Sequence, residues 1–416
     1  MPKEAQVVIG GVDTHKDVHV AAVIDERAKI LDTKSFEATA GGYRELVSWM
    51  RSFGELVRIG VEGTGAYGAG LARYLADEGI EVVEVNRPNR QARRRRGKSD
   101  TVDAEAAARA ALNGEAQVAP KAQRGVVESI RVLRVAFTSA RDSRTRVANQ
   151  IRDLIVTAPD ELRSVLGPLP TAERVARCAG FSVTGDLADP LVGTKLALRT
   201  LARRYQALST EMTGLEAELD RLTARANPAL RGAKGVGSDV AAIMLTAAGD
   251  NPERLKSESA LAALCGVSPV EASSGKVVRH RLNRGGNRQA NHALWRIVMV
   301  RLSTGDPATR AYFERRRAEG KSDREIVRCL KRHVVREVYR HLVRPEPMPD
   351  GADLRARRQE AGVTLQTVAD ALGTWPTRIS ELERGLKFDT DLARRYAQWL
   401  DVRLGAQQEE IPLQAA

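Results

Sequence analysis

Four acidic residues in the first quarter of the chain have the types and spacing of a divalent-cation site. Asp13 ends an apolar run in the segment GVDTHKD, and Glu62 ends another in GVEGTG. Asp100 and Asp103 begin an alanine-rich segment, and their three-residue spacing places both on one face of a helix. Carboxylate oxygens with few thiols or imidazoles nearby suit Mg²⁺ or Mn²⁺. Two such ions ~4 Å apart can stabilise the attacking and leaving oxygens of a phosphodiester.

A run of cations directly precedes the last two acids and comprises Arg93, Arg94, Arg95, Arg96 and Lys98. Such a run is usually a solvated loop, but beside a metal site it would hold the phosphates of a nucleic acid. His15 and His19 are four residues apart, so they would share a transition-metal site only on a helix. Strand-forming residues surround both histidines, and we therefore do not expect that site.

The elements that must position the acids follow from short β-branched runs, helical spacing and turn residues. Strands are expected at 7–12, 18–24, 29–36, 57–62 and 81–85, and helices at 41–53 and 67–77. Three strands followed by alternating helices and strands is the order of an RNase H-like α/β fold. Adjacent strands of one sheet would bring Asp13 and Glu62 together, and the helix that carries Asp100 and Asp103 would cover them.

The middle of the chain is predicted to be helical. Apolar residues recur at intervals of three and four from Ile130 to Leu154 and again from Leu198 to Leu222, which is typical of coiled coils. The two helices could form an antiparallel hairpin, a contact between subunits, or the core of a bundle within one subunit. Asn227 and Pro228 end the second helix, and 230–242 resembles a helix-hairpin-helix, although two glycines also make ordinary turns.

The C-terminal part is expected to form several short helices. Thr364 and Thr374 would begin two of them, while Gly373 and Gly385 would end two. This spacing resembles a Cro/repressor-type helix-turn-helix, and a small oligomerisation module is the alternative. The second helix would present four side chains to a major groove, namely Trp375, Thr377, Arg378 and Glu381.

These patterns predict an α/β plus α protein of several domains. The expected parts are an RNase H-like domain (1–118), coiled-coil helices (119–226), a mostly helical domain (227–343), a proline-rich linker (344–352), a small helix-turn-helix (353–402) and a tail (403–416).

Charge and composition limit the classes of function. The formal net charge is +13, which excludes an acidic scaffold and favours a polyanionic partner. Residues 1–86 hold 9 basic and 14 acidic residues, so the remainder carries +18. The 3 cysteines are too few and too far apart for a disulfide framework. The absence of a run of ~18 apolar residues and of a leader predicts a soluble, cytoplasmic protein without a membrane partner.

The motifs resemble a known family. The segments DTHKD, VEGTGAYG and KSDTVDA are similar to the RuvC-like DEDD transposases of bacterial insertion sequences, also called bridge-RNA-guided serine recombinases. Residues 266–291 are similar to the second domain of that family, through GVSPVEASSGK and RGGNRQAN. The resemblance covers about residues 7–340, and the predicted helix-turn-helix lies outside the usual extent of the family.

The resemblance implies roles for particular residues. Asp13, Glu62, Asp100 and Asp103 match the acidic tetrad of the family, which acts with Mg²⁺, and Ser274 matches its serine nucleophile. Ser273 is the close alternative, because the SSG sequence offers two hydroxyls. A serine hydroxyl is a weak nucleophile until a base or a metal activates it. The cations that could bind the scissile phosphate there are Lys276, Arg279, Arg281, Arg284 and Arg288.

The resemblance also implies a transposase or recombinase that forms a covalent phosphoserine link to DNA. Its partners would be donor DNA, target DNA and a structured guide RNA. Its active site would be shared between subunits of a dimer or tetramer. Two alternatives remain: a metal-dependent nuclease similar to a Holliday-junction resolvase, which needs no serine, and a non-enzymatic DNA-binding regulator that depends on residues 354–400.

Overall fold

The computed structural model describes residues 6–85, 99–275, 280–345, 348–386 and 389–409. The chain divides into two compact units, which are described separately. The first comprises residues 1–125 and 248–261, and the second comprises 126–247 and 262–416. The first unit combines a β-sheet with helices, and the second unit is mostly helical.

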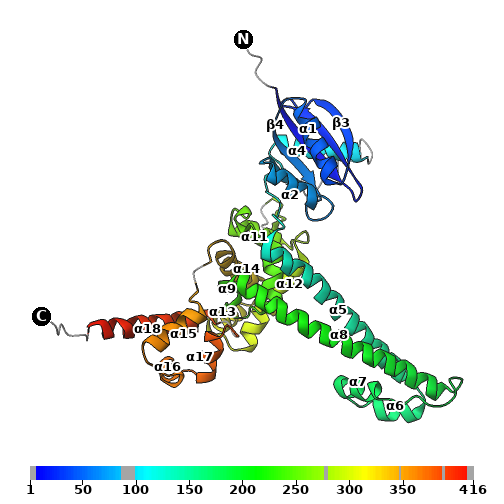
Figure 1. Cartoon of the computed structure of the whole chain (residues 1–416), viewed down its shortest axis with the longest axis vertical. Helices are drawn as coiled ribbons and strands as arrows, with labels where there is room; N and C mark the ends of the chain where they lie inside the picture. The colour runs from blue at the N-terminus through cyan, green and yellow to red at the C-terminus, as the bar shows by residue number, and fades with distance from the viewer. Residues whose placement is uncertain (1–5, 86–98, 276–279, 346–347, 387–388, 410–416) are drawn as a thin grey trace. The chain divides into compact units, whose positions relative to one another are not determined.

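The first unit is built on a five-stranded sheet in the order β3-β2-β1-β4-β5 (Figure 1). Strand β1 pairs antiparallel with β2 and parallel with β4; β2 pairs antiparallel with β3, and β4 pairs parallel with β5. The strands are β1 Val7–Thr14, β2 Val18–Asp25, β3 Ile30–Glu37, β4 Glu55–Glu62 and β5 Glu81–Val85. All five predicted strands are confirmed. The signal is a short run of β-branched and other apolar residues bounded by turns.

Helices cover both faces of this sheet. Helices α1 (Ala40–Arg51) and α2 (Ala69–Asp77) pack on one face, where Val8 and Val12 meet Leu46 of α1. Helix α4 (Asp100–Leu112) packs on the other face, where Ile9 meets Ala107. Because neighbouring strand residues point to opposite faces, odd-numbered positions of β1 face α4.

Two glycines let α4 lie against the sheet at backbone distance. A Cβ added at Gly11 of β1 would lie 2.2 Å from the carbonyl oxygen of Ala104 and from the amide nitrogen of Ala108. A Cβ added at Gly60 of β4 would lie 2.4 Å from the carbonyl oxygen of Ala107. Only glycine therefore fits at these positions, and they set the distance between the sheet and the helix that carries two of the predicted metal ligands.

Replacing Gly11 by Ala is expected to push α4 away from β1. Overpacking that strikes backbone costs about 1–3 kcal/mol or more, so the melting temperature of this unit should fall by about 5 °C or more. Thermal unfolding by circular dichroism and hydrogen exchange of residues 100–112 measure the effect. Gly41→Ala is the matched control, because its nearest neighbouring atom would be 3.8 Å away. Unchanged melting and exchange in the Gly11 variant would contradict this account.

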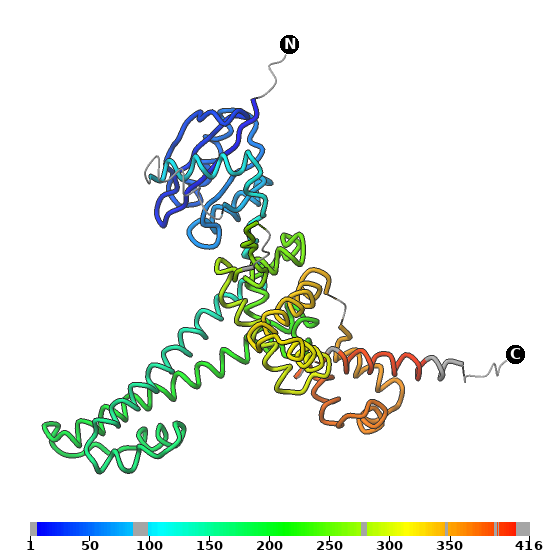
Figure 2. The backbone as a smooth tube through the Cα atoms, turned by 180° about the vertical axis from the view of Figure 1, so that it is seen from behind, coloured from blue at the N-terminus to red at the C-terminus, as the bar shows by residue number. Residues whose placement is uncertain are grey.

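The second unit begins with two long helices, as predicted. Helix α5 (Gly125–Val156) runs outward and α8 (Pro190–Ala226) returns beside it (Figure 2). They share a core in which Val147 and Ile151 meet Leu198 and Ala202, so this core forms within one subunit. The short helices α6 (Asp160–Leu166) and α7 (Thr171–Ala179) complete the core, and the apolar spacing does not predict them.

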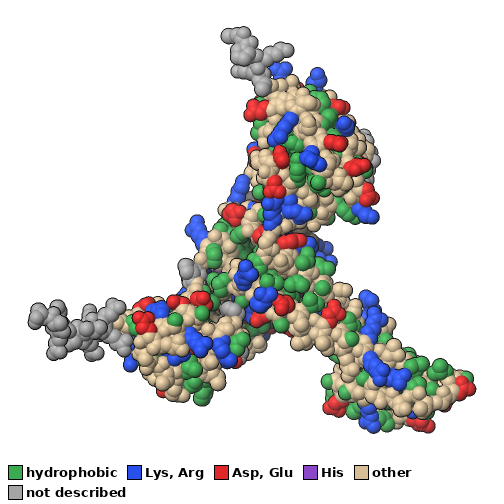
Figure 3. Space-filling view, in the orientation of Figure 1, with side chains coloured by type: hydrophobic (Ala, Val, Ile, Leu, Met, Phe, Trp, Pro, Cys, Tyr) green, Lys and Arg blue, Asp and Glu red, His purple; other side chains and the backbone are tan. Residues whose placement is uncertain are grey.

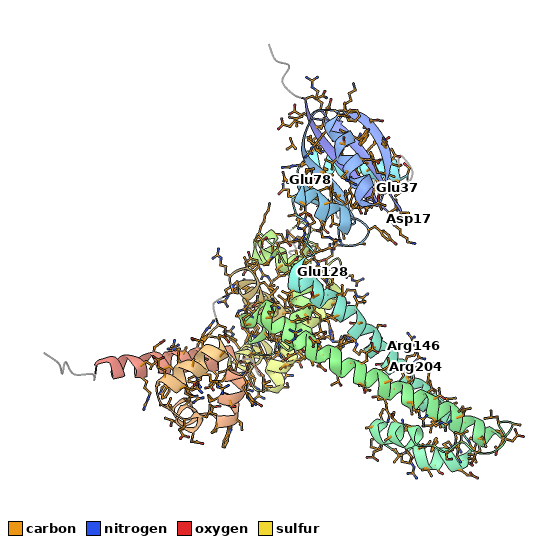
Figure 4. All side chains as sticks on the ribbon, in the orientation of Figure 1. Asp17, Glu37, Glu78, Glu128, Arg146 and Arg204 are labelled. Carbon is orange, nitrogen blue, oxygen red and sulfur yellow. The ribbon has the colours of Figure 1, made fainter. Side chains whose placement is uncertain are left out.

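The contact between these two helices also includes a charged side chain. The guanidinium of Arg144 in α5 lies 5.7 Å from the ring centroid of Tyr205 in α8, which keeps a charged residue within an otherwise apolar seam. Arg146 of α5 and Arg204 of α8 are exposed (Figure 4).

Further helices follow Asn227, which ends α8 as predicted, and the segment 248–261 among them belongs to the first unit. They are α9 Pro228–Arg231, α10 Ser238–Ala248, α11 Glu258–Leu264, α12 Arg288–Ser303, α13 Pro307–Ala318 and α14 Asp323–Val343, with a two-stranded ladder of β6 Val270–Glu271 and β7 His280–Arg281. A short 3-10 helix covers Pro252–Arg254. Within the described ranges, we find no helix that is both long enough and apolar enough to cross a bilayer.

Four helices at the C-terminal end share a core of their own. They are α15 Gly351–Glu360, α16 Leu365–Leu372, α17 Pro376–Glu383 and α18 Thr390–Glu409. At the centre of the core, the buried carboxylate of Glu383 accepts hydrogen bonds from Arg358 Nε at 2.7 Å and from the Tyr396 hydroxyl at 2.8 Å. This network joins α15, α17 and α18. A buried charge is stable only when its hydrogen bonds are satisfied, and Arg358 and Tyr396 satisfy those of Glu383.

Candidate active site

Asp13 and Glu62 lie side by side at the ends of two parallel strands. Val12 of β1 is in register with Val61 of β4, so each acid is the next residue of its strand. Each follows, by two positions, a glycine that contacts α4 (Gly11 and Gly60), and residues two apart share a face of a sheet. Both carboxylates therefore belong to the face that α4 covers. Asp13 is 8% exposed, whereas Glu62 is half-buried.

Helix α4 brings the other two acids to the same end of the sheet. Its N-cap is Ser99, whose hydroxyl accepts a hydrogen bond from the backbone N–H of Val102 at 3.3 Å. Asp100 and Asp103 then occupy the first turn, where the helix dipole favours negative charge. The side chain of Asp100 is 52% exposed, and Asp103 is 3% exposed. Asp100 thus faces solvent, and Asp103 faces the sheet.

His15 completes a compact group of metal-ligand atoms. Its Nε2 lies 3.3 Å from Oδ2 of Asp13 and 3.4 Å from Oδ1 of Asp100. One ligand atom from each of these three residues lies within 4.8 Å of the other two. Among the residues that the structure describes, Glu62 and Asp103 flank this group without belonging to it.

Sequence reasoning did not select His15 as a ligand. The two histidines form no shared site: the ring of His19 is fully buried and stacks on Tyr43 of α1 at 5.7 Å. The prediction that His15 and His19 share no metal site is confirmed, but that prediction did not consider His15 by itself. The spacing Asp13-x-His15 would have identified it, because residues two apart at a strand end can face the same ion.

The electrostatics of the cluster favour a cation. Burial raises the pKa of the Asp13 carboxyl; His15 lowers it, and the carboxylates of Asp103 and Asp100 raise it again. Carboxylates that repel one another in a half-buried site are stabilised in their charged form by a positive ion. The carboxylate oxygens suit Mg²⁺. The same carboxylates together with one imidazole also suit Mn²⁺.

The loop that follows Glu62 is held in place by two side chains. The hydroxyl of Thr14 donates to the backbone carbonyl of Glu62 at 2.8 Å. The amide of Gln123 donates to the carbonyl of Thr64 at 2.6 Å, and Thr64 is itself buried. These contacts keep the glycine-rich turn from moving freely at the edge of the acidic cluster.

The predicted serine lies in the second unit. Ser273 and Ser274 are both exposed, and Gly275 follows them with φ of 57°, a left-handed conformation suited to glycine. Arg281, Arg284 and Arg288 are also exposed and remain predicted phosphate ligands. The other predicted phosphate ligands lie outside the described residues: Arg93, Arg94, Arg95, Arg96, Lys98, Lys276 and Arg279.

Side chains of α12 and α14 hold the backbone that precedes the serine pair in the sequence. The side-chain amide of Asn291, in α12, donates to the carbonyls of Cys265 and Gly266 at 2.8 and 3.2 Å. Lys331 of α14 donates to Oδ1 of Asn291 at 2.8 Å. Gly286 contacts Gly266 so closely that a Cβ would lie 2.3 Å from its amide nitrogen. The RGGNRQAN motif therefore packs against the start of the GVSP block.

The C-terminal helices place the predicted DNA-contacting residues around α17. Trp375 is 78% exposed and Thr377 is exposed. Arg378 forms an ion pair with Asp389 at 3.2 Å, and Glu381 is half-buried. Gly373, between α16 and α17, has φ of 64°, which ends α16 as expected.

Two family models match the chain. One, described as a transposase of the DEDD IS110 type, matches residues 10–158. The other, described as the transposase IS116/IS110/IS902 family, matches residues 214–314. The chain is therefore similar to transposases of the IS110 type over these two regions. The first family region contains all four predicted acids and His15, and the second contains the serine pair.

Two curated relatives are proteins of insertion elements. The chain is 26% identical to the uncharacterized 43.6 kDa protein of insertion element IS110 from Streptomyces coelicolor, over 51% of this chain and 63% of that protein. It is 29% identical to the uncharacterized 42 kDa protein of insertion element IS900 from Mycobacterium paratuberculosis, over 42% of this chain and 47% of that protein. The chain thus spans about half to two thirds of these relatives. Both family regions end before α14 and the C-terminal helices.

Proposed function

We propose that this chain is a DNA transposase with an RNase H-like N-terminal domain and a metal-binding acidic site. The observation that carries the proposal is the meeting of Asp13, His15 and Asp100, whose ligand atoms lie within 4.8 Å of one another beside Glu62 and Asp103. The sheet order β3-β2-β1-β4-β5, with β4 and β5 parallel to β1, supports the RNase H-like assignment.

Asp13, Glu62, Asp100 and Asp103, with His15, would hold Mg²⁺ or Mn²⁺. When bound, such ions supply positive charge to the oxygens of a phosphodiester as it is cut. The chain itself contributes the fixed carboxylates at the strand ends and the α4 turn that faces them. The close packing of Gly11 and Gly60 on α4 preserves that geometry.

We further propose that Ser274 is the nucleophile. Its Oγ would replace one deoxyribose oxygen on phosphorus, giving a phosphoserine ester, and the displaced oxygen would leave as a hydroxyl after gaining a proton. A second DNA hydroxyl would then attack the same phosphorus and release the serine, so that one phosphodiester is exchanged for another. The exposed SSG turn and Arg281, Arg284 and Arg288 support this role.

The partners of this reaction are proposals as well. They are donor and target DNA, a guide RNA, and further copies of this chain in a dimer or tetramer with a shared active site. The net charge of +13 supports nucleic-acid partners. Both family regions match models described as transposases, which supports DNA as a substrate.

The C-terminal helices support a second, auxiliary function. We propose that α15 to α18 are a helix-turn-helix domain that binds duplex DNA through α17. The tight connection at Gly373, the separate core and the exposed Trp375 support this assignment. Such a domain could choose a target site in addition to any guide RNA.

One assay distinguishes the candidate functions. The protein is incubated with Mg²⁺ and labelled duplexes that carry insertion-sequence ends, and the products are separated with and without protease. A transposase with a serine nucleophile gives a protein–DNA adduct and rejoined strands. A junction-resolving nuclease gives cut ends without attached protein, and a regulator gives binding alone; either result would refute the proposal.

A further inference from the structure

A short segment of the second family region packs into the first unit. Residues 248–261 belong to that unit, although the family region that contains them spans 214–314. They contact residues 118–124, which follow α4 and are called the connecting segment below. The contact is made by three side chains: Asp250, Asn251 and Arg254. The first unit is therefore completed by a part of the chain that is remote in sequence from its sheet.

Asp250 holds the backbone of the connecting segment in an unusual conformation. One oxygen of its carboxylate accepts a hydrogen bond from the N–H of Gln123 at 3.0 Å, and the other accepts from the N–H of Arg124 at 2.5 Å. Gln123 has φ of 52°, a left-handed conformation that is uncommon for a residue other than glycine. Backbone strain of this kind persists where the surrounding contacts impose it, and it is concentrated at functional sites.

Asn251 and Arg254 fix the rest of the connecting segment. The side chain of Asn251 accepts from the N–H of Ala122 at 3.1 Å and donates to the carbonyl of Pro120 at 2.9 Å. Acidic and basic side chains are interspersed over the face of the sheet-bearing unit visible in Figure 3, and exposed ion pairs add little stability. The pair between Arg254 and Glu84 of β5, at 3.1 Å, differs because the arginine side chain is only 6% exposed. Breaking this pair would leave a buried charge without its partner.

Gln123 connects this restraint to the candidate metal site. Its side-chain amide donates to the carbonyl of Thr64 at 2.6 Å, and Thr64 is 1% exposed. Thr64 lies two residues after Glu62, and the intervening Gly63 has φ of 74°, so the backbone could pivot there. The hydroxyl of Thr14 holds the carbonyl that precedes this glycine, and Gln123 holds the carbonyl that follows it.

A purely structural tie would not need the Gln123 side chain. The bonds from Asp250 and Asn251 to the backbone already attach the connecting segment to residues 248–261. The Gln123 amide instead reaches the turn that follows a predicted metal ligand. Because a buried carbonyl without a partner is costly, removing this amide favours movement of the turn.

We infer that Gln123 is a positioning residue for the metal ligand Glu62, and that Asp250 of the second family region holds Gln123 in place. The inference rests on the proposed metal site. Gln123 acts through the turn beyond Glu62 rather than as a ligand, and it keeps the Glu62 carboxylate beside Asp13. All the proposed ligands lie within residues 10–158, so Asp250 gives the second family region a part in forming their site.

The test is the binding of Mn²⁺ to full-length Gln123→Ala in the absence of DNA. Isothermal titration calorimetry gives the affinity, and electron paramagnetic resonance of free Mn²⁺ checks it. Loss of a side chain that supports a metal ligand weakens metal affinity by about 10–100-fold, so we expect a Kd for Mn²⁺ that is about tenfold higher or more. The melting temperature without metal should fall by no more than about 5 °C, because one hydrogen bond is lost. A merely structural role would change the melting temperature and leave the Mn²⁺ affinity of the folded protein unchanged.

Gln117→Ala is the matched control, because Gln117 is an exposed glutamine just before the connecting segment. Its Mn²⁺ affinity should equal that of the unmodified protein. Asp250→Asn should weaken Mn²⁺ binding, and the double variant with Gln123→Ala should bind no more weakly than Gln123→Ala alone, since both changes act through one contact. Unchanged affinity in Gln123→Ala, or losses that add in the double variant, would overturn the inference.

Asp13→Asn in the same titration separates this inference from the proposed function. If Asp13→Asn loses Mn²⁺ binding while Gln123→Ala keeps it, the inference fails and the proposed metal site stands. If Asp13→Asn binds Mn²⁺ as tightly as the unmodified protein, the proposed metal site fails and the inference fails with it.

Discussion

Replacing Asp13 by Asn is expected to lower metal-dependent DNA strand cleavage by about a thousandfold. The substitution keeps the shape of the side chain but removes the charge of the most central acid, which is 8% exposed and whose carboxylate lies beside His15. Loss of several kcal/mol of charge stabilisation corresponds to about three orders of magnitude in rate. The rate is measured with labelled duplexes under single-turnover conditions, with Mg²⁺ and with Mn²⁺.

Asp17→Asn is the matched control for this variant. Asp17 is an exposed acid in the turn between β1 and β2, close in sequence to Asp13 but outside the group of ligand atoms (Figure 4). Its cleavage rate should stay within about twofold of that of the unmodified protein. Cleavage by the Asp13 variant at a normal rate, with its fold verified by circular dichroism, would show that the acidic cluster is not the metal site.

Replacing Ser274 by Ala is expected to abolish the covalent protein–DNA adduct. Alanine has no oxygen to attack phosphorus, whereas the exposed turn at Gly275 requires nothing from the serine side chain that alanine lacks. The adduct is measured on denaturing gels, and mass spectrometry locates the modified residue. Affinity for DNA should change by less than about twofold, because one neutral hydroxyl adds little to a charge-dominated interface.

Ser273→Ala serves both as control and as competitor. The adjacent serine has the same hydroxyl and is also exposed, so the two variants test each hydroxyl in turn. An adduct that persists in the Ser274 variant but disappears in the Ser273 variant would move the nucleophile by one residue. Strand cleavage without an adduct in the unmodified protein would instead favour the metal-dependent nuclease.

The sheet and its acids were predictable because local patterns determine them. Short β-branched and apolar runs mark the strands of the first unit, and Asp13 and Glu62 end two strands that were expected to be neighbours. The helix that begins with Asp100 and Asp103 was predicted from its alanine-rich composition, and Ser99 caps it. These features depend on residues that are close together along the chain, so they can be predicted from a single sequence.

The short helices α6 and α7 were not predicted, for a physical reason. They have 7 and 9 residues, too few for a periodic pattern to stand out, and prolines stand at both N-caps. They form because they bury Leu166 and Val175 against α5 and α8. Their stability comes from tertiary packing rather than from helix propensity.

Local sequence patterns identified the residues that could do chemistry: the four acids, the serine pair and the basic segments. Which of these residues meet depends on how the chain packs. The packing added His15 to the cluster of Asp13 and Asp100 and revealed that Gly11 and Gly60 allow α4 to approach the sheet. The reason is that coordination and close packing depend on distances between residues remote in sequence, which only the packing of the folded chain sets.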